Sequence, residues 1–420
     1  MVPKGWITKA LELTGVKVID GDRGKEYPKA SDFSGDGYCL FLSAKNVTKY
    51  GFQFNELQFI DAEKDKKLRK GRVKRSNIVL TTRGSVGHFA YYDASVPYDV
   101  MRINSGMVIL DADESDLEPN FLYALCRSFI VQKQIEAASF GSAQPQLTVG
   151  IVKGLKLPIP TLVEQKKIAQ ILSTWDKAIS VTEKLLTNSQ LQKKALMQQL
   201  LTGEKRLLDD NGVRFSGEWK ITKLIQMGKV VSGGTPDTNM DAYWDGDIQW
   251  LTPTDVTALT GRFVNNTSRR ITSTGLQNCS AVLLPKGSLM VCTRATIGAL
   301  AISASEICTN QGFKNIIPNE EFNVEFIYYL LQMNIKEMIK KSSGSTFLEL
   351  SKKDFEAISV SCPLIKEQQK IAAVLSAADA EISILEKKLA CLKDEKKALM
   401  QQLLTGKRRV KVEAEEAVSA

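Results

Sequence analysis

Two long segments of nearly the same sequence limit the possible folds of this chain more than any other feature. Residues 164–206 begin EQKKIAQILS and end KKALMQQLLTGEKR, and residues 367–409 begin EQQKIAAVLS and end KKALMQQLLTGKRR. The two copies align without a gap, 203 positions apart (367 − 164). Because twice this offset nearly equals the chain length of 420 residues, the whole chain is predicted to be a tandem duplication.

Within each copy, apolar residues recur at heptad spacing, which is typical of the seam of a coiled coil. The two rows of the first copy are Ile168, Trp175, Thr182, Ser189, Leu196 and Leu172, Ile179, Leu186, Lys193, Leu200, and those of the second are Ile371, Ala378, Leu385, Leu392, Leu399 and Leu375, Ile382, Leu389, Lys396, Leu403. Polar members weaken the first seam. Since the duplication supplies a second helix of matching length, the two helices are expected to pack as an antiparallel coiled coil with a pseudo-twofold axis.

Each predicted helix follows a proline, Pro160 or Pro363, and stops at a Thr-Gly pair, at Gly203 or Gly406. The segments before the helices mix short β-branched or aromatic runs, many turn residues and one late helix. The expected fold class is therefore α/β (α+β), with two domain copies joined by two long α-helices and an internal pseudo-twofold repeat. The predicted boundaries are domains at 1–156 and 207–359, helical spacers at 157–206 and 360–410, and a disordered tail at 411–420.

Composition excludes several classes of protein. The seven cysteines never lie two apart and His88 is the only histidine, so disulfides and structural zinc are not expected. No apolar run approaches the roughly 20 residues of a spanning helix and the N-terminus lacks a targeting pattern, so we expect a cytoplasmic protein with no membrane partner. The net charge of +9 favours a polyanionic partner.

Short motifs recur in the two predicted domains in the same order. LSAKNV (42–47) parallels LTPTDV (251–256), TRGSVG (82–87) parallels TRATIG (293–298), and SFGSAQPQL (139–147) parallels SSGSTFLEL (342–350). The domains have nevertheless diverged far more than the helices. The chain is therefore expected to alternate variable domains with constant helices.

The EQxKIAxxLS opening and KKALMQQLLTGxxR end of each helix, the TRGxxG-like turns and the two-fold repetition resemble the specificity subunits of type I restriction-modification systems. The resemblance covers almost the full chain, and the helix ending in LLTG is its specific part. It implies two target recognition domains, each contacting one half of a split DNA site, and helices that set the gap between the halves. It also implies that the helices dock two DNA methyltransferase subunits, to which restriction subunits add.

The same resemblance implies that S-adenosylmethionine, ATP and Mg are bound by the partner subunits. Consistent with this, the sequence contains neither a methyltransferase tetrapeptide nor a GxxxxGK[ST] phosphate loop. We therefore predict a non-catalytic chain that binds double-stranded DNA. The alternative is a coiled-coil scaffold that joins two protein-binding domains.

The strongest charge feature is KDKKLRKGRVKR at 64–75, with eight basic residues and one acidic residue. Blocks of like charge repel one another unless they are solvated or neutralised, so this run favours a polyanion nearby. An exposed, solvated loop is the alternative. The predicted phosphate contacts are Lys66, Lys67, Arg69, Lys70, Arg72, Lys74 and Arg75.

Arg83 and Arg294 stand at equivalent places before glycine-containing turns. Each could pair with a phosphate or a guanine edge, or could instead tie down its turn. The second domain is not basic overall, so a DNA surface there must come from local placement. The further DNA-binding candidates are Lys45, Asn46, Lys49, Gln144, Gln146, Thr252, Thr254, Arg262, Arg269, Arg270 and Ser345.

The segment KKALMQQLLTG is repeated in both helices on every face, which is more than a seam requires, because a seam constrains only two heptad positions. Binding of an equivalent partner subunit to each copy would explain this, and recent duplication is the alternative. The candidate partner-binding residues are Lys166, Lys167, Lys184, Lys370, Lys387 and Lys388.

Overall fold

The computed structural model describes residues 2–139, 146–343 and 348–412. Contacts divide the chain into unit 1, which comprises Met1–Glu183 and Lys387–Ala420, and unit 2, which comprises Lys184–Glu386. Each predicted helical spacer thus contributes one part to each unit. From position 413 onwards, the predicted disordered tail lies outside the described residues.

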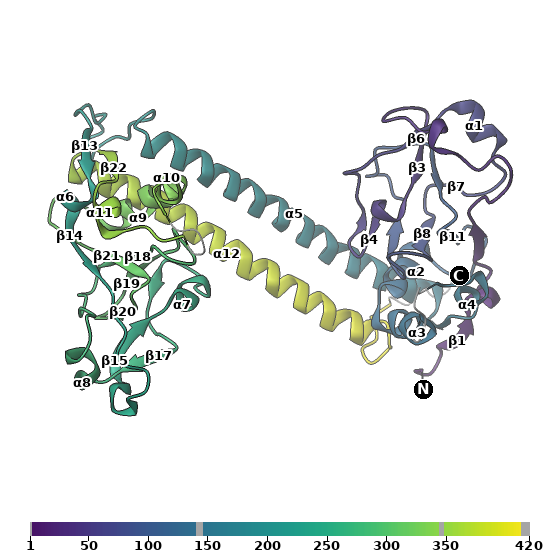
Figure 1. Cartoon of the computed structure of the whole chain (residues 1–420). Coiled ribbons are helices and arrows are strands. Elements are labelled where there is room, and N and C mark those ends of the chain that lie inside the picture. Colours follow the sequence, from purple (N-terminus) through teal and green to yellow (C-terminus); the bar gives the residue numbers. More distant parts are fainter. Residues whose placement is uncertain (1, 140–145, 344–347, 413–420) are drawn as a thin grey trace. The chain divides into compact units, whose positions relative to one another are not determined.

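The two long helices have the extents expected from the sequence. Helix α5 spans Leu162–Leu201 and α12 spans Ile365–Leu403, each without interruption (Figure 1). Just beyond them, Gly203 and Gly406 have φ values of 75° and 70°, in the left-handed region where glycine ends helices. Every member of the predicted heptad rows is buried or partly buried, which confirms the seam.

Ion pairs across the seam show that the helices run antiparallel within each unit. In unit 1, Lys396 Nζ lies 2.5 Å from Asp176 Oδ1, and Arg409 Nε lies 2.6 Å from Glu164 Oε1. The matching pairs in unit 2 are Lys193 with Asp379 at 2.5 Å and Arg206 with Glu367 at 2.6 Å. Each pair has its counterpart 203 positions away with the helices exchanged, as residues do across a twofold dimer interface.

Unit 1 contains a small mixed domain built on two four-stranded sheets. Their strand orders are β2-β11-β8-β9, which we call the helix-side sheet, and β6-β3-β10-β7, which we call the outer sheet. The elements are β1 (Ile7–Ala10), η1 (Leu11–Thr14), β2 (Lys17–Asp20), η2 (Ala30–Asp32), β3 (Cys39–Leu42), η3 (Ala44–Asn46), β4 (Val47–Thr48), β5 (Gly51–Phe52), β6 (Phe59–Ile60), α1 (Ala62–Lys67), β7 (Arg72–Val73), β8 (Ile78–Thr81), β9 (Phe89–Tyr91), β10 (Met101–Ile103), β11 (Met107–Asp111), α2 (Pro119–Cys126), α3 (Phe129–Ser139), α4 (Val149–Lys153) and β12 (Lys156–Ile159).

Unit 2 repeats this plan with a helix-side sheet of order β14-β21-β18-β19-β16 and an outer sheet of order β17-β15-β20. Its elements are β13 (Lys220–Lys223), α6 (Leu224–Met227), β14 (Gly228–Ser232), η4 (Asp241–Tyr243), β15 (Trp244–Leu251), α7 (Pro253–Thr257), β16 (Phe263–Val264), β17 (Arg269–Ile271), α8 (Ser273–Gln277), β18 (Leu289–Cys292), β19 (Leu300–Ser303), β20 (Cys308–Thr309), β21 (Phe313–Pro318), α9 (Val324–Met333), α10 (Ile335–Lys340), α11 (Lys352–Glu356) and β22 (Ser359–Cys362).

Strand alternation separates the cores on the two faces of each helix-side sheet. In β8, Ile78 and Leu80 pack with α2 and the long helices, whereas Val79 faces a second core between the two sheets. In β18, Leu289 and Met290 divide in the same way. The outer sheets also match, because β3 pairs parallel with β10 and β15 pairs parallel with β20. The predicted fold class of two α/β domains with two long helices is confirmed.

Candidate nucleic-acid interface

The basic segment 64–75 forms α1 and the edge strand β7 of the outer sheet in unit 1. Arg102, on the neighbouring strand β10, is only 5% exposed and donates from Nε to Asp65 Oδ1 at 2.5 Å. Its Nη1 donates to the Lys70 carbonyl at 2.7 Å, and its Nη2 donates to the carbonyls of Asp65 and Leu68. One buried guanidinium therefore holds the backbone of the basic segment in place.

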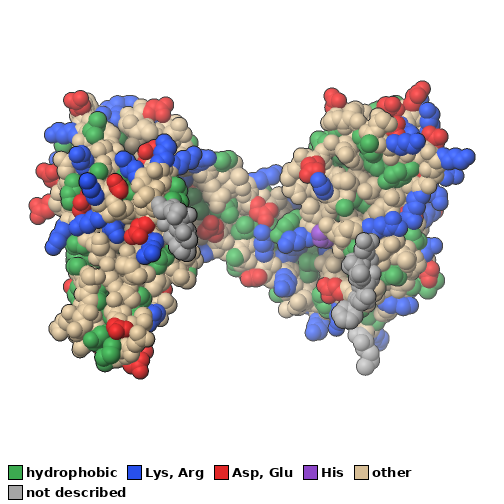
Figure 2. All heavy atoms as spheres, viewed as in Figure 1, with side chains coloured by type: hydrophobic (Ala, Val, Ile, Leu, Met, Phe, Trp, Pro, Cys, Tyr) green, Lys and Arg blue, Asp and Glu red, His purple; other side chains and the backbone are tan. Residues whose placement is uncertain are grey.

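The predicted phosphate-contact residues of this segment fall into two groups. Three have acidic partners, and these are Lys67 with Glu63 at 3.8 Å, Arg72 with Asp65 at 3.3 Å and Arg75 with Asp99 at 2.7 Å. Four are exposed and have no ion pair within 4 Å in the described part of the chain, and these are Lys66, Arg69, Lys70 and Lys74. Figure 2 shows Lys and Arg side chains gathered over α1 and β7. The second group is the part of the segment that is available to a polyanion.

The turn arginines of the two units have matching surroundings. Both side chains are exposed, and each residue forms a backbone bridge with the end of a following loop, Arg83 with Gln146 and Arg294 with Glu349. The Gln146 side-chain oxygen, facing the guanidinium, accepts from Arg83 Nη2 at 2.9 Å, and Arg294 Nε lies 3.8 Å from Glu349 Oε2. Each arginine thus ties its turn to that loop while keeping an exposed side.

Asn46 has a buried, structural position. It is 2% exposed, its side-chain oxygen accepts from Ser43 N at 2.8 Å, and its amide donates to the Glu56 carbonyl at 2.8 Å. Lys45 is exposed but pairs with Glu56 at 2.6 Å, and Lys49 is exposed. Of these three candidates, the two lysines reach the surface and the asparagine organises the turn beneath them.

The matching stretch of unit 2 is the start of α7. Thr252 caps the helix, and its hydroxyl and backbone N donate to Asp255 Oδ2 at 2.7 and 2.9 Å. Burial opposes the ionisation of Asp255, but hydrogen bonds from Thr252 and Ser268 outweigh it and lower the pKa of the carboxyl. Thr254 is exposed. Thr252 is thus engaged in capping, whereas Thr254 faces solvent.

The arginines of unit 2 have three different environments. Arg269 is exposed on β17 and lies over the Trp244 ring at 3.7 Å, and the adjacent Arg270 is also exposed. The Arg262 side chain is only 17% exposed and pairs with Glu325 at 2.6 Å. Arg269 and Arg270 therefore present charge to solvent, and Arg262 does not. Two further candidates, Gln144 and Ser345, lie outside the described residues.

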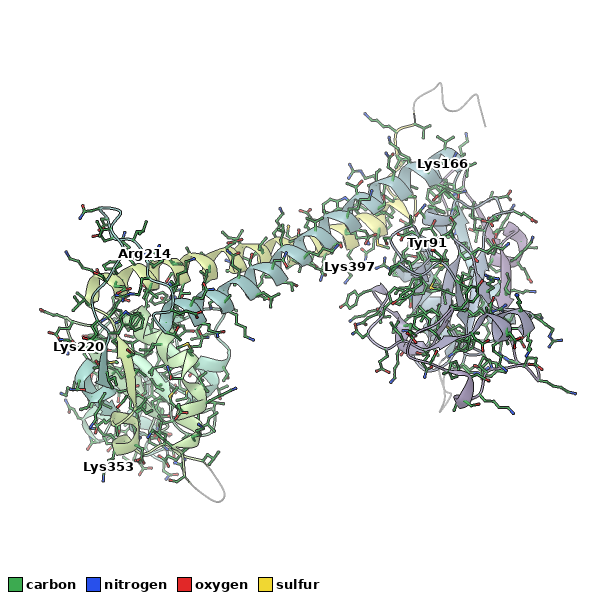
Figure 3. The ribbon with its side chains drawn as sticks, turned by 90° about the horizontal axis from the view of Figure 1, so that it is seen from above. Tyr91, Lys166, Arg214, Lys220, Lys353 and Lys397 are labelled. Carbon is green, nitrogen blue, oxygen red and sulfur yellow. The ribbon has the colours of Figure 1, made fainter. Side chains whose placement is uncertain are left out.

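The partner-binding candidates line the two long helices. Lys166 and Lys167 lie on exposed positions at the start of α5 (Figure 3), and Lys184, Lys387 and Lys388 are likewise exposed. Lys370 is partly buried and pairs with Asp210. Five of the six candidates are thus open to a partner.

Within residues 2–139, 146–343 and 348–412, no cluster of His, Cys, Asp or Glu could hold a metal ion. The seven cysteines are free thiols, and burial raises the pKa of Cys39 and Cys292 to about 12, far from a nucleophilic thiolate. None of the described helices is long and apolar enough to span a membrane.

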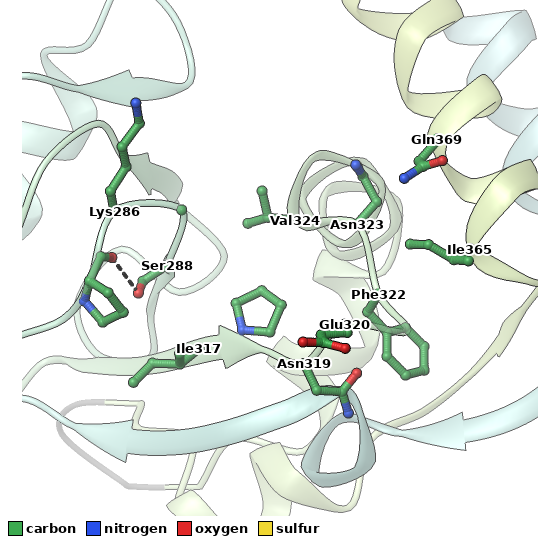
Figure 4. A pocket seen from close by; sticks show the side chains of 13 residues that line it. Lys286, Ser288, Ile317, Asn319, Glu320, Phe322, Asn323, Val324, Ile365 and Gln369 are labelled. Carbon is green, nitrogen blue, oxygen red and sulfur yellow. Dashed lines mark hydrogen bonds between the residues drawn. The ribbon is translucent and has the colours of Figure 1, made fainter.

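A pocket of about 390 Å³ in unit 2 lies beside the start of α12 (Figure 4). Its polar lining includes Lys286, Glu320 and Asn323, and Ser288 Oγ donates to the Pro285 carbonyl at 2.7 Å. Asn323 is committed to capping α9 through Phe326 N at 2.9 Å. The pocket therefore offers one acidic and one basic side chain, Glu320 and Lys286, that form no ion pair within 4 Å with any described residue.

Arg102 and the seam aspartates, Asp176 and Asp379, are not among the residues predicted from sequence. A single charged residue between the apolar Met101 and Ile103 was the available signal for Arg102. For the aspartates, the signal was their identical spacing from the start of each helix repeat. Neither pattern predicts the ion-pair partner of the residue, because the partners lie far away in the chain.

Comparison with known proteins gives a consistent result. The family model described as "Type I restriction modification DNA specificity domain" matches residues 5–189 and 216–394, most of the chain. The MjaIX type I restriction enzyme specificity subunit of Methanocaldococcus jannaschii is 39% identical over 161 residues, which cover 38% of this chain and 37% of that relative. The MjaVIII specificity subunit of the same organism is 26% identical over 329 residues, which cover 74% and 75%.

Solved structures show the same fold. The crystal structure of a type I restriction-modification S subunit from M. genitalium aligns over 96% of both chains, with a TM-score of 0.60 and 16% identity. A chain from a study of complex assembly and conformational transition of the type I R-M system aligns over 96% of this chain and 98% of its own length, with a TM-score of 0.55 and 18% identity.

Proposed function

This chain belongs to the family of DNA specificity subunits of type I restriction-modification systems, and from that premise we propose that its two domains each recognise one half of a split, asymmetric DNA site. Such subunits are non-catalytic and give the complex its DNA specificity. One observation supports the proposal most: each of the two similar domains packs on the two long helices, and the same ion pairs join these helices in both units with the helices exchanged. Pseudo-twofold symmetry of this kind places two recognition elements on two half-sites.

The proposed DNA surface of unit 1 is the exposed part of the basic segment together with the turn at Arg83. Lys66, Arg69, Lys70 and Lys74 carry unpaired charge, so they suit phosphates, which position a protein without selecting sequence. Arg83 keeps an exposed side and forms a backbone bridge with Gln146, and Gln144 belongs to the proposed surface by its place in the sequence. In unit 2 the corresponding surface consists of Arg294, Arg269, Arg270 and Thr254.

The long helices are the proposed docking sites for two DNA methyltransferase subunits and the element that sets the gap between half-sites. Support comes from the five exposed lysines and from the segment KKALMQQLLTG, which is the same in both copies at every position, inside and outside the seam. A solved relative was studied for complex assembly of a type I system. In the complex that we propose, restriction subunits join the methyltransferase subunits, and the partner subunits bind S-adenosylmethionine, ATP and Mg. The domain boundaries at 1–156, 157–206, 207–359 and 360–410 are part of the same proposal.

The experiment is to map methylated adenines across the host genome by single-molecule sequencing, with and without this gene. Loss of one split, asymmetric motif is the expected result, and it would give both half-sites and their gap at once. The scaffold alternative requires an unchanged map that added methyltransferase also fails to alter. Native mass spectrometry tests the stoichiometry, since saturation at one methyltransferase per chain contradicts two docking sites.

A further inference from the structure

Each recognition domain meets the long helices at an aspartate of the seam, and the two aspartates are 203 positions apart. Asp176 accepts Lys396 from the opposite helix at 2.5 Å, and Asp379 accepts Lys193 at the same distance. Both lie just beyond the apolar core that joins the domain to the helices, about one turn past Leu172 and Leu375. The two sites therefore have the same helical framework and can be compared directly.

In unit 2, a loop of the domain reaches this site. Arg262, which precedes β16, donates from Nη2 to Glu325 Oε2 on α9 at 2.6 Å and to Ser376 Oγ on α12 at 2.8 Å. Its Nη1 lies 3.6 Å from Asp379 Oδ2. The Tyr329 hydroxyl donates to the same Asp379 oxygen at 2.6 Å. One guanidinium thus connects three separate elements: the β16 loop, the domain helix α9 and the long helix α12.

In unit 1, the corresponding place is a cavity of about 540 Å³. Tyr50, from the matching loop between β4 and β5, stands at its edge and is 71% exposed. Tyr91, labelled in Figure 3, and Tyr123 also line the cavity and stack with ring centroids 5.5 Å apart. The domain cation nearest the aspartate is Arg127, at the end of α2, 3.9 Å from Asp176. That contact comes from a helix that already belongs to the shared core.

Both domains are also held near the start of a long helix, where Gln165 accepts from Glu118 N at 2.8 Å and Gln368 accepts from Asn323 N at 3.0 Å. Away from these hydrogen bonds the shared attachment is largely apolar, and a body held in this way can rock because dispersion contacts have little directionality. A second contact from a different element removes that freedom, and charge-assisted hydrogen bonds fix direction as well as distance. Unit 2 has this second contact at Arg262, and unit 1 has an unfilled space there. The enclosed position of Arg262 and its acidic partners also make it unsuitable as a phosphate contact.

We propose that Arg262 is a positioning residue that fixes the second recognition domain on the long helices, while the first recognition domain, which lacks this contact, retains freedom to rock. In a complex with a split DNA site, the movement of unit 1 then lets the protein accept gaps of altered length, and the fixed position of unit 2 makes it discriminate between gap lengths. This consequence for the gap rests on the proposed function. The positioning itself does not.

The test uses the full chain in complex with its methyltransferase, and two opposite substitutions. Arg262→Gln removes the charged contact, and Tyr50→Arg offers a guanidinium to the unit 1 cavity. Arg262→Lys is the matched control, because it keeps a cation that can reach Glu325. Binding is measured on DNA duplexes that carry the mapped half-sites separated by the native gap or by one base pair more or fewer.

Arg262→Gln is expected to lower the preference for the native gap by about tenfold, the effect of losing one charge-assisted hydrogen bond. Arg262→Lys should retain most of that preference, and Tyr50→Arg should increase it. An equal loss of affinity on all three gaps would overturn the proposal, because it would show a merely structural role.

Hydrogen exchange on the same variants separates this proposal from the proposed function. Arg262→Gln should accelerate exchange in β16 and its preceding loop by at least several-fold while leaving α9 unchanged. Uniform acceleration throughout unit 2, or none, overturns the positioning role. If the wild-type complex recognises no split site, the gap consequence is overturned together with the proposed function, and the exchange result alone decides the role of Arg262.

Discussion

The two recognition domains share their attachment to the helices and differ in the surfaces they expose. Their inner contacts match down to equivalent hydrogen bonds: Gln165 donates to the Asp116 carbonyl at 3.0 Å, and Gln368 donates to the Glu321 carbonyl at 3.1 Å. The outer sheet of unit 1 carries basic α1, whereas the matching α8 in unit 2 has the uncharged sequence STGLQ. The shared parts are those that a common helical framework requires, and the divergent parts are those that a specific DNA half-site would select.

The outer sheets are also stabilised differently. In unit 1, the buried Arg102 and Asp65 form the ion pair beneath the basic segment, with side chains 6% and 2% exposed. In unit 2, an aromatic pair replaces it, with Trp244 and Trp250 ring centroids 5.0 Å apart and Arg269 exposed above them. The basic surface of unit 1 therefore depends on a buried charge, whereas the cation of unit 2 rests on an apolar support.

The largest expected effect comes from Arg102→Met. This substitution leaves the Asp65 carboxylate buried, and its remaining cation is Arg72, whose Nη1 lies 3.3 Å from Asp65 Oδ2. The free energy of unfolding should fall by about 3–5 kcal/mol. The control is Arg269→Met in unit 2, where loss of an exposed cation–π contact should cost only about 0.5–1 kcal/mol. Urea denaturation followed by hydrogen exchange of each unit measures both. Equal effects of the two substitutions would remove the distinction between buried and exposed support.

The second effect concerns binding. The triple variant Lys66→Gln, Lys70→Gln, Lys74→Gln should weaken DNA binding about equally for all sequences. The slope of log K against the logarithm of the salt concentration should become shallower by about 0.9 per lost phosphate contact. Lys220→Gln with Lys223→Gln, exposed on β13 of unit 2, is the control and should leave the salt dependence unchanged. Titrations at several salt concentrations measure both slopes. A changed recognition sequence in the triple variant would argue against phosphate contacts.

A smaller effect tests the reciprocal seam. Burial lowers the pKa of Lys396, opposed by Asp176, so the charged form is disfavoured in the folded state. At pH values between this lowered pKa and the ordinary 10.5, the unfolded chain binds more protons, and stability rises with pH. Lys396→Leu should stabilise the chain by about 1–2 kcal/mol at pH 7 through apolar burial, and it should abolish this rise. Denaturation at several pH values between 7 and 10.5 measures the rise in the free energy of unfolding. A steeper rise in the variant than in the wild type would refute the assignment of this rise to Lys396.

The smallest expected effect lies in the arginine turns. Gly84 has φ 72° and its counterpart Ala295 has φ 61°, a conformation that costs an L residue about 1 kcal/mol. Gly84→Ala should therefore destabilise unit 1 by about 1 kcal/mol, since a Cβ there meets only Ala44 at 3.7 Å and the cost is in the backbone. Ala295→Gly should change stability by less than about 0.5 kcal/mol, because relief of strain offsets the added chain entropy. Thermal unfolding measures the pair, and the opposite order would contradict the matched geometry of the turns.

The candidate interface could be predicted from sequence only in part. Local charge density pointed to the segment 64–75, but ion pairing separates Arg72 and Arg75 from Lys66 and Lys70, although all four side chains are exposed. Composition cannot make that separation, because Asp65 and Asp99 become partners only after the chain folds. Arg262 illustrates the same limit, since its acidic partner Glu325 lies 63 positions away.

The sequence by itself determined the duplication, the two helices with their boundaries, the antiparallel seam and the family. These depend on periodicity and on end signals within a few residues, which the order of residues encodes directly. The tertiary structure alone decided which cations face solvent and that Arg102 supports the basic segment. It also decided that Arg262 occupies its site in unit 2, whereas the corresponding place in unit 1 is a cavity beside Tyr50. The physical reason is that burial and ion pairing depend on segments brought together by folding, and no local pattern specifies which distant residue will be the partner.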